Sequence, residues 1–470
     1  MSKKVFVPKE NRPKCGIVYS DSLKESNESR YLAEYFCGQL VSTGYANVYM
    51  VGVTPDGVPG SLSSYSNKRM SYMPSYSANG KKIEIPAGDV THAHFDVLGQ
   101  CHVIIITVNS NDTKMCKEKL FSILDIKRQS KDVAVTIFAM SRGVKNSNEF
   151  KDAFSSRKDI AVVECVVGFA AVPHPKNGAI VPTVQAPVII FERLDKEIAG
   201  IAGGPCNLME CMKLEVYYRK VLTPYTWGTL LWENLHCVNM ITGGSMYDTL
   251  WNKRARLLLA SMMRESLLTL KQAAGGGKWM PEMLPITQWI SPRTLEMWMC
   301  SPGWIFVSLL SLWDMCPPKD LVSPMQVDLT EGRITVSKSH LGELISTGKR
   351  YNVHMPVCSE VGKLLETMES GGPRKSETAY LSLLENNIME SVKSYGQEQN
   401  AKASSSDVNP EVHTSWEGFG ARSLRAFRSR LYRLALYALL VLILYILFVH
   451  EHEHEELLEH MPGHLDQEIM

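Results

Sequence analysis

The stretch SPMQVDLTEGRITVSKSHLGELISTGKRYNVHMP, from Ser323 to Pro356, decides the fold of the C-terminal half. Gly348 stands where a helix C-cap is wanted, and a second helical run, VCSEVGKLLETMES, follows from Val357. Together they predict an all-helical core segment of an intracellular domain. The first helix is indicated by apolar residues spaced for one helix face, namely Val336, Leu341, Leu344 and Ile345.

Length and composition set the frame for the rest of the chain. At 470 residues it has room for two or three domains, and 45% apolar with 21% charged residues is ordinary for a globular protein with sizeable cores. A net charge of +1 argues against a general nucleic-acid binder, because phosphate binding needs a basic excess. No nucleic-acid partner is therefore expected.

The cysteines and the opening residues indicate a cytosolic body. Eleven cysteines occur singly, without a CxxC pair or zinc spacing, which predicts reduced and mostly buried thiols. The opening residues MSKKVFVPKENRPK are charged and lack an apolar core, so we expect no secretory signal there.

The region 13–198 begins like a doubly wound nucleotide-binding fold. CGIVY from Cys15 predicts a strand, the run ending at Gly44 a helix, and ANVYMVGV a second strand. The connecting loop, SDSLKESNES from Ser20 to Ser29, contains no glycine, whereas G-x-G-x-x-G is what lets a backbone approach a pyrophosphate. Asp21, Glu25 and Glu28 would repel that group. The serines and Lys24 are the alternative phosphate contacts.

Further along, a Ser-, Tyr- and Gly-rich stretch to about His94 predicts a long loop with one hairpin at Asn79–Gly80, either a variable excursion or a binding surface. Apolar runs at 101–109, 133–140 and 161–194 predict the remaining strands. His174 between prolines is expected to be a rigid-loop residue rather than a catalytic one. The glycine-rich joint at 199–205 is the predicted boundary to a helical domain, residues 205–395.

Several motifs resemble the ketopantoate reductase family over residues 13–395. In its C-terminal domain the family has a Ser-Ser-Met-x-x-Asp turn, a Gly-Arg pair and a later Pro, and its Leu-Trp-Glu-Lys-Leu helix resembles the segment around Trp232 and Glu233. The resemblance implies a Rossmann-like α/β domain followed by an all-α domain of the 6-phosphogluconate-dehydrogenase-like type. The matching residues are Ser323, Met325, Asp328, Gly332, Arg333, Thr335, Gly342 and Pro356.

The departures fall on the family's functional positions. Its general-acid Lys corresponds to Asn234, which cannot give up a proton, and its catalytic Glu corresponds to Val336. Two cofactor contacts correspond to Asn109 and Arg142. Ser323 is the surviving substrate-side hydroxyl on this alignment.

The C-terminal part predicts a tail anchor. A polar, small-residue linker covers 396–421, an apolar helix at 431–450 is long enough for a thin bilayer, and an acidic, His-containing tail covers 451–470. Arginines before the span keep the body in the cytosol by the positive-inside rule, and the endoplasmic reticulum is favoured over the mitochondrial outer membrane. The alternating Glu and His of the tail lack the shape of a metal site, so no metal is expected.

Three functions remain open. The first is a catalytically inactive reductase-like protein on a membrane, acting through an unknown protein partner or a retained small ligand, with no cofactor. The second is an active NADP-dependent reductase of a 2-keto acid such as ketopantoate, with Lys24 or Arg142 as substitute cofactor contacts and Ser323 on the substrate side. The third is a purely structural membrane adaptor that acts through the tyrosine-rich loop.

Overall fold

The computed structural model describes residues 12–22, 24–44, 46–54, 70–75, 82–127, 134–140, 146–184, 187–194, 204–212, 214–275, 281–282, 291–312, 316–372 and 376–403. Met1–Val392 forms one compact unit and Lys393–Met470 a second. Arg142, the linker beyond Ala403, the apolar run 431–450 and the tail 451–470 lie outside the described residues, so the predictions made for them stay predictions.

An eight-stranded sheet forms the first lobe of the larger unit, in the order β12-β11-β8-β7-β6-β1-β2-β5. Neighbours are parallel except β8 and β11, which confirms the predicted doubly wound α/β class. The strands are β1 (Lys14–Ser20), β2 (Asn47–Val53), β5 (Val90–His92), β6 (Val103–Ile106), β7 (Val135–Ala139), β8 (Ile160–Val167), β11 (Val188–Glu192) and β12 (Glu215–Arg219).

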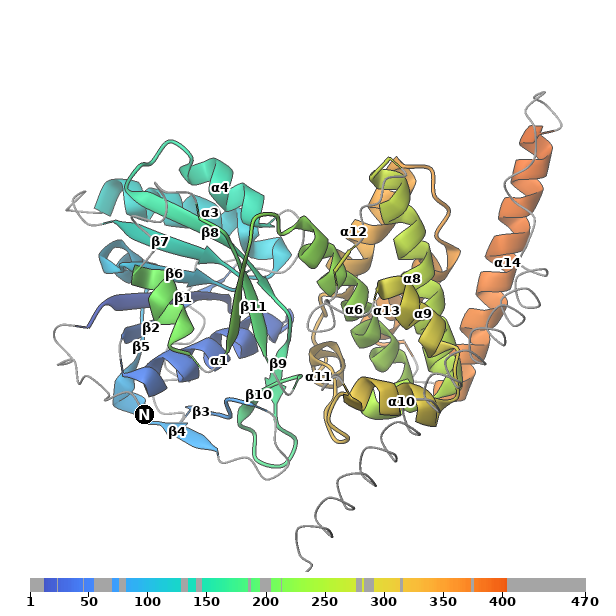
Figure 1. The fold of residues 1–470 in the computed structure, drawn as a ribbon, viewed down its shortest axis with the longest axis horizontal. Coiled ribbons are helices and arrows are strands. Elements are labelled where there is room, and N and C mark those ends of the chain that lie inside the picture. Colours follow the sequence, from blue (N-terminus) through green and yellow to red (C-terminus); the bar gives the residue numbers. More distant parts are fainter. Residues whose placement is uncertain are drawn as a thin grey trace, which may run out of the picture. The chain divides into compact units, whose positions relative to one another are not determined.

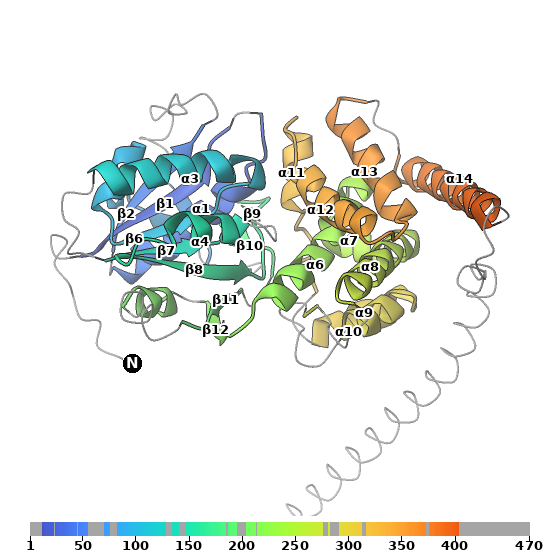
Figure 2. The same cartoon turned by 90° about the horizontal axis from the view of Figure 1, so that it is seen from above.

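Both faces of this sheet are covered, which explains why the central strands are continuous apolar runs. On one face lies α1 (Glu28–Thr43), together with a small sheet of order β4-β3-β10-β9. On the other face lie α3 (Thr113–Ser122) and α4 (Asn146–Phe154) (Figures 1 and 2). The small sheet consists of β3 (Met70–Tyr72), β4 (Ile83–Ile85), β9 (Ala171–Pro173) and β10 (Ile180–Pro182).

The small sheet tests two of the predicted turns. β3 and β4 pair antiparallel, as the hairpin at Asn79–Gly80 requires, although those two residues lie outside the described ones. Gly178 has φ 65° in the turn between β9 and β10, and the buried His174 both donates its amide to Ala179 and accepts at Nδ1 from the Lys176 amide. His174 is thus part of a fixed turn, as predicted.

The predicted domain boundary at 199–205 was placed too early. A helix at 204–210 packs into the core of the sheet lobe through Cys206, Leu208 and Met209, and β12 then adds an edge strand to the sheet. The sheet lobe therefore continues to Arg219. A glycine-rich segment signals a break in helix or strand, but it does not tell which lobe the next residues join.

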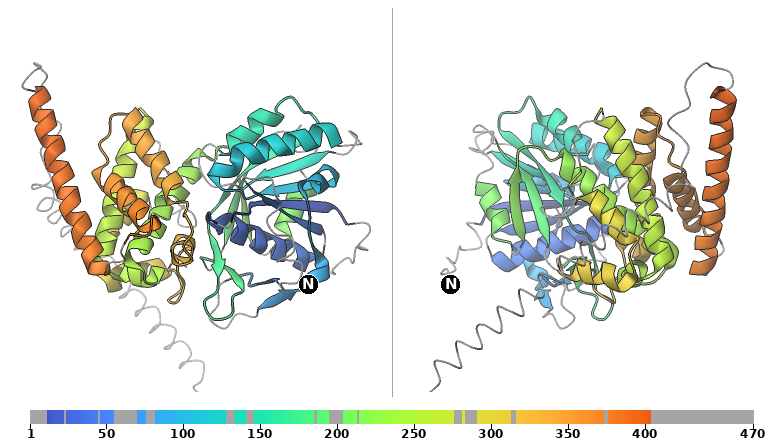
Figure 3. Two further views of the ribbon diagram at one scale, coloured as in Figure 1. Left: turned by 180° about the vertical axis from the view of Figure 1, so that it is seen from behind. Right: turned by 45° about the vertical axis from the view of Figure 1, so that its right-hand side comes forward.

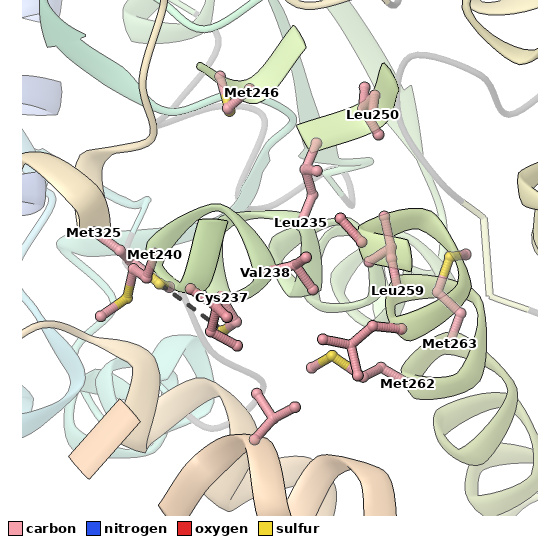
Figure 4. Close-up of a cluster of buried hydrophobic side chains, with 14 of the residues drawn as sticks. Leu235, Cys237, Val238, Met240, Met246, Leu250, Leu259, Met262, Met263 and Met325 are labelled. Carbon is pink, nitrogen blue, oxygen red and sulfur yellow. Dashed lines mark hydrogen bonds between the residues drawn. The ribbon is translucent and has the colours of Figure 1, made fainter. Parts of the chain in front are cut away.

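The second lobe is helical and comprises α6 (Thr223–Thr242), α7 (Met246–Trp251), α8 (Lys253–Ala273), α9 (Pro292–Met299), α10 (Gly303–Leu312), α11 (Pro324–Thr330), α12 (Ser337–Arg350), α13 (Pro356–Glu369) and α14 (Glu377–Ala403) (Figure 3). Its core is rich in methionine and leucine, and the Cys237 thiol lies 4.0 Å from the Met325 sulfur (Figure 4). Such flexible side chains fill the irregular gaps between short helices.

The deciding stretch folds as two helices with a turn, and Gly348 has a role other than the predicted one. α12 continues past it to Arg350. A Cβ at Gly348 would lie 2.5 Å from the Met355 sulfur. The absence of a side chain at Gly348 therefore leaves room for the turn that follows α12. α14 likewise continues to Ala403, into the first residues of the range predicted as a linker. Among the described residues no helix is both long and apolar enough to span a membrane.

All eleven cysteines are described as free thiols, and eight of them are buried, as predicted for a reduced body. Burial raises the pKa of several thiols, that of Cys101 to about 12, which makes them poor nucleophiles. The eight buried cysteines are therefore core residues, whereas Cys211 and Cys300 are exposed.

Candidate functional site

The site lies where β1 and β6 end side by side in the middle of the sheet. Ligands of doubly wound folds bind outside the carboxyl ends of the strands at the point where strand order reverses, which here is between β1 and β6. The loop 21–27 follows β1, and the short helical turn Ser110–Asp112 follows β6. These two connections decide what the site can hold.

The loop 21–27 is fastened to the helical lobe. The Lys24 carbonyl accepts from the Ile334 amide at 2.8 Å, and Glu25 forms a parallel bridge with Ile334. Ser26 Oγ donates to Asp328 Oδ2 at 2.5 Å, and the Asn27 amide donates to Asp328 Oδ1 at 3.1 Å. Asp328 is completely buried, so these contacts exclude water from its carboxylate.

Asp328 has a counter-charge in Arg333. Arg333 Nε donates to Asp328 Oδ1 at 3.1 Å, and the same guanidinium pairs with Glu331 and reaches the Tyr31 hydroxyl at 3.5 Å. Burial raises the pKa of Asp328, while the Ser26, Asn27 and Arg333 donors lower it. The carboxylate is thus desolvated but well supplied with donors.

The space between the two lobes is almost filled. It has a volume of about 20 Å³, which is room for one water molecule, whereas sites for small ligands measure about 300–1,000 Å³. His340 Nδ1 lies 2.8 Å from Glu233 Oε2 beside this space, and both side chains are buried. The lining residues are Glu28, Ser29, Leu32, Thr107, Val108, Asn109, Ser110, Val336, Ser339 and His340.

Two of the sequence-predicted site residues meet at this space. Val336 lines it, so the position of the family's catalytic Glu is apolar here. Asn109 also lines it, but its amide Nδ2 donates to the Ser26 carbonyl at 3.1 Å and its backbone amide donates to Ser20 Oγ at 2.9 Å. Asn109 thereby holds the loop 21–27 in place.

The other predicted residues do not line this space. Lys24 is exposed, and Asn234 is 2% exposed inside the helical lobe. Ser323 is fully buried as the N-cap of α11, where its hydroxyl accepts from the Gln326 amide at 3.1 Å. Ser323 therefore has a structural role as an N-cap, and the predicted substrate-side role stays a prediction. Arg142 lies outside the described residues.

The surroundings of the loop are acidic, as predicted. Burial raises the pKa of Asp21, Glu25 and Asp112, and Asp112 further raises that of Glu25. Asp21 also rests on Gly52 at the end of β2, where a Cβ would lie 2.8 Å from the Asp21 Cβ. Wherever these carboxylates are ionised, they would repel a pyrophosphate.

These contacts decide whether the site can hold a nicotinamide dinucleotide. A dinucleotide pyrophosphate needs donors at the N-terminus of α1, and the Asn27 amide is already bound to the Asp328 carboxylate. The backbone cradle of glycines is absent, and the space beside it admits a water molecule only. The described residues in this arrangement do not fit a nicotinamide dinucleotide. Nor are any three or more of their His, Cys, Asp and Glu side chains grouped to hold a metal ion.

Sequence reasoning missed the residues that dominate the site. His340 follows Val336 by one helical turn, and nothing in the sequence marks it as the partner of Glu233 on another helix. Asp328 was recognised as a pattern residue, but its contact with Ser26, 302 positions earlier, could not be read from the sequence. The first contact depends on how α6 and α12 pack within the helical lobe, and the second on how the two lobes meet.

No family model matches the chain, and no curated protein matches it by sequence. Solved structures do match. A PanE/ApbA family ketopantoate reductase from Ralstonia eutropha JMP134 aligns with TM-score 0.51 and 13% identity, over 76% of this chain and 99% of its own. D-mandelate dehydrogenase in a ternary complex with NADH and anilino(oxo)acetate aligns with TM-score 0.51 and 12% identity, over 76% and 99%.

The fold and the matches define a class first: a two-lobed α/β-plus-helical fold shared with dehydrogenases and reductases. More particularly, the chain has the ketopantoate reductase fold, which confirms the resemblance seen in the sequence. At 12–13% identity the likeness concerns the fold, and what the site does is a separate question.

Proposed function

We propose that this chain is a catalytically inactive binding protein built on the ketopantoate reductase fold and attached to a membrane. The observation that carries the proposal is the α1 N-terminus, whose Asn27 amide is bound by the buried Asp328 carboxylate where a dinucleotide would place its pyrophosphate. The nearly filled space beside it, with Val336 at the position of the catalytic Glu, supports the same conclusion.

Calorimetric titration of the full chain with NADPH and NADH tests this proposal. We expect no binding at millimolar cofactor, because binding would have to displace Asp328 and place phosphate among buried carboxylates. Circular dichroism of the same sample verifies that the protein is folded. Micromolar affinity for either cofactor would contradict the proposal.

One observation favours the alternative, an active NADP-dependent reductase of a 2-keto acid. The His340–Glu233 pair lies beside Val336 and could deliver the proton that Asn234 cannot. NADPH oxidation with a panel of 2-keto acids that includes ketopantoate tests it. Turnover that is lost in His340→Ala, but kept in Ser339→Ala beside it, would establish this alternative. We expect none in either variant.

Membrane attachment is proposed from the sequence of residues 431–450 and the arginines before it. Full-length chain expressed in cells is expected to stay in the pellet after alkaline carbonate extraction, whereas a chain ending at Gly420 is released. A glycosylation acceptor added after Met470 reports whether the tail crosses the endoplasmic reticulum membrane. Release of the full-length chain by carbonate would contradict the anchor.

A further inference from the structure

The N-terminus of α1 is the position at which this class of fold binds anions. α1 has 16 residues, and the first amides of such a helix point outward with a partial positive charge. Glu28 donates its amide to Ser26 Oγ at 3.1 Å, and Asn27 donates to Asp328 Oδ1 at 3.1 Å. The helix end is therefore satisfied from within the chain, although the Asn27 side chain makes no capping bond.

We propose that Asp328 is an internal ligand whose carboxylate fills an anion-binding site at the N-terminus of α1, a site suited to carboxylate and phosphate groups. The inference goes beyond the proposed function, because it names the group that occupies the site and the chemistry that the site retains.

Three kinds of donor converge on this carboxylate. They are a hydroxyl from Ser26, a backbone amide from Asn27 and the guanidinium of Arg333. Hydroxyl, amide and guanidinium together form the donor set that proteins use for phosphates and carboxylates. The carboxylate they hold comes from α11, in the other lobe of the chain.

The site is distinct from an ordinary helix cap. In α7 the cap is local, because Ser245 and Asp248 exchange hydrogen bonds within one turn. Asp328 reaches α1 from 302 positions away and is fully buried, with Arg333 beside it as a counter-charge. Removing the side chain would therefore leave a water-sized hole that is lined by donors, with the more exposed Glu331 as the remaining counter-charge of Arg333.

That hole gives the proposal a specific test, which is rescue by an external anion. In full-length Asp328→Ala the midpoint of thermal unfolding is expected to fall by on the order of 5 to 10 °C, because the Ser26 and Asn27 donors lose their acceptor and Arg333 keeps only the more exposed Glu331 as a counter-charge. Sodium formate, which matches the lost carboxylate, is titrated in at constant ionic strength set with sodium chloride. Part of the lost midpoint should return with saturating dependence on formate, and inorganic phosphate is tested in the same way.

Three controls isolate the anion site. Formamide has the shape of formate without its charge and should give no recovery. Asp328→Asn fills the hole with a neutral amide, so it should be destabilised but insensitive to formate. Asn239→Ala removes a buried hydrogen-bond partner of the Ser323 amide without leaving an anion hole, and it should likewise be insensitive. The wild-type protein should show only the small general effect of the salt.

Two outcomes would overturn the proposal. One is an Asp328→Ala protein as stable as wild type, and the other is a destabilised variant that responds no more to formate than Asp328→Asn does. If Asp328→Ala does not fold in buffer, its refolding yield in formate against chloride replaces the thermal midpoint as the readout. No nicotinamide cofactor is used, so this result is independent of the cofactor titration.

Discussion

At α1 and at α13, backbone amides at the helix N-terminus donate to a buried carboxylate from another element. The two sites differ in the other groups that bind this carboxylate. At α1 the Asn27 amide, the Ser26 hydroxyl and the Arg333 guanidinium all bind Asp328. At α13 the Val357 and Cys358 amides donate to the two oxygens of Glu265 on α8, each at 2.9 Å.

Burial raises the pKa of both acids, and different donors oppose that rise. Burial raises the pKa of Glu265 to about 7, and the two amides offset only part of that rise. At Asp328 the cation Arg333 adds its charge to the offset. Neither set of donors fully offsets burial, and the Asp328 site is distinguished by the guanidinium and the hydroxyl among its donors.

The largest expected effect comes from removing each carboxylate in turn. Asp328→Ala is expected to lower the free energy of unfolding by about 3–5 kcal/mol, since the Ser26 hydroxyl and the Asn27 amide lose their acceptor and Arg333 loses its buried partner, keeping only the more exposed Glu331. Glu265→Ala leaves only amides unsatisfied and should cost about 1–3 kcal/mol. Urea unfolding of both variants at pH 7 measures the difference. Equal losses would mean that Arg333 contributes nothing at α1.

The pH dependence of stability sharpens the same comparison. A pKa raised from 4.5 to about 7 means that folded Glu265 holds a proton that the unfolded chain has released, so stability is highest below pH 4.5 and falls as pH rises through 7. The full change is about 3 kcal/mol. Urea unfolding of wild type and Glu265→Gln at pH 5 and pH 8 isolates it. A stability gap between the two proteins that does not change with pH would contradict the assignment.

The smallest expected effect concerns a helix that begins on a neutral group. Ser323→Ala at the N-cap of α11 removes the acceptor of the Gln326 amide and should cost about 1 kcal/mol, with no change in cofactor binding. Thermal unfolding and the NADPH titration check both halves of this expectation. A loss of keto-acid-dependent NADPH oxidation without loss of stability would favour the substrate-side role predicted for Ser323.

Local pattern was enough to predict most of the fold. The helix ending at Gly44 and the helices around Trp232 and Val357 were confirmed, because each carries its own apolar period and its own stop signals. β12 was missed because EVYYR is a half-buried edge strand that follows a helix, and nothing local ties it to the sheet. The role of Gly348 was predicted wrongly, because this glycine leaves room for the Met355 side chain instead of capping the helix.

For the candidate site, the sequence could predict only which functional residues are missing. Residue types sufficed to show that Asn234 cannot donate a proton and that the loop from Ser20 lacks glycine. They could not show what replaces those functions, since Ser26 meets Asp328 only when the two lobes are folded together, and Glu233 meets His340 only when α6 and α12 pack within the helical lobe. Long-range contacts of this kind leave no periodic trace in the sequence.

The distance along the chain between Ser26 and Asp328 also has a consequence during synthesis. Ribosomes add about 5–20 residues per second, so the 302 positions between them correspond to roughly 15–60 s of translation. During that interval β1 and α1 have left the ribosome while the carboxylate that fastens them does not yet exist. A nascent sheet lobe therefore exposes the Ser26 hydroxyl and the Asn27 amide, and both Asp328 and Arg333 reach them only after α11 has emerged.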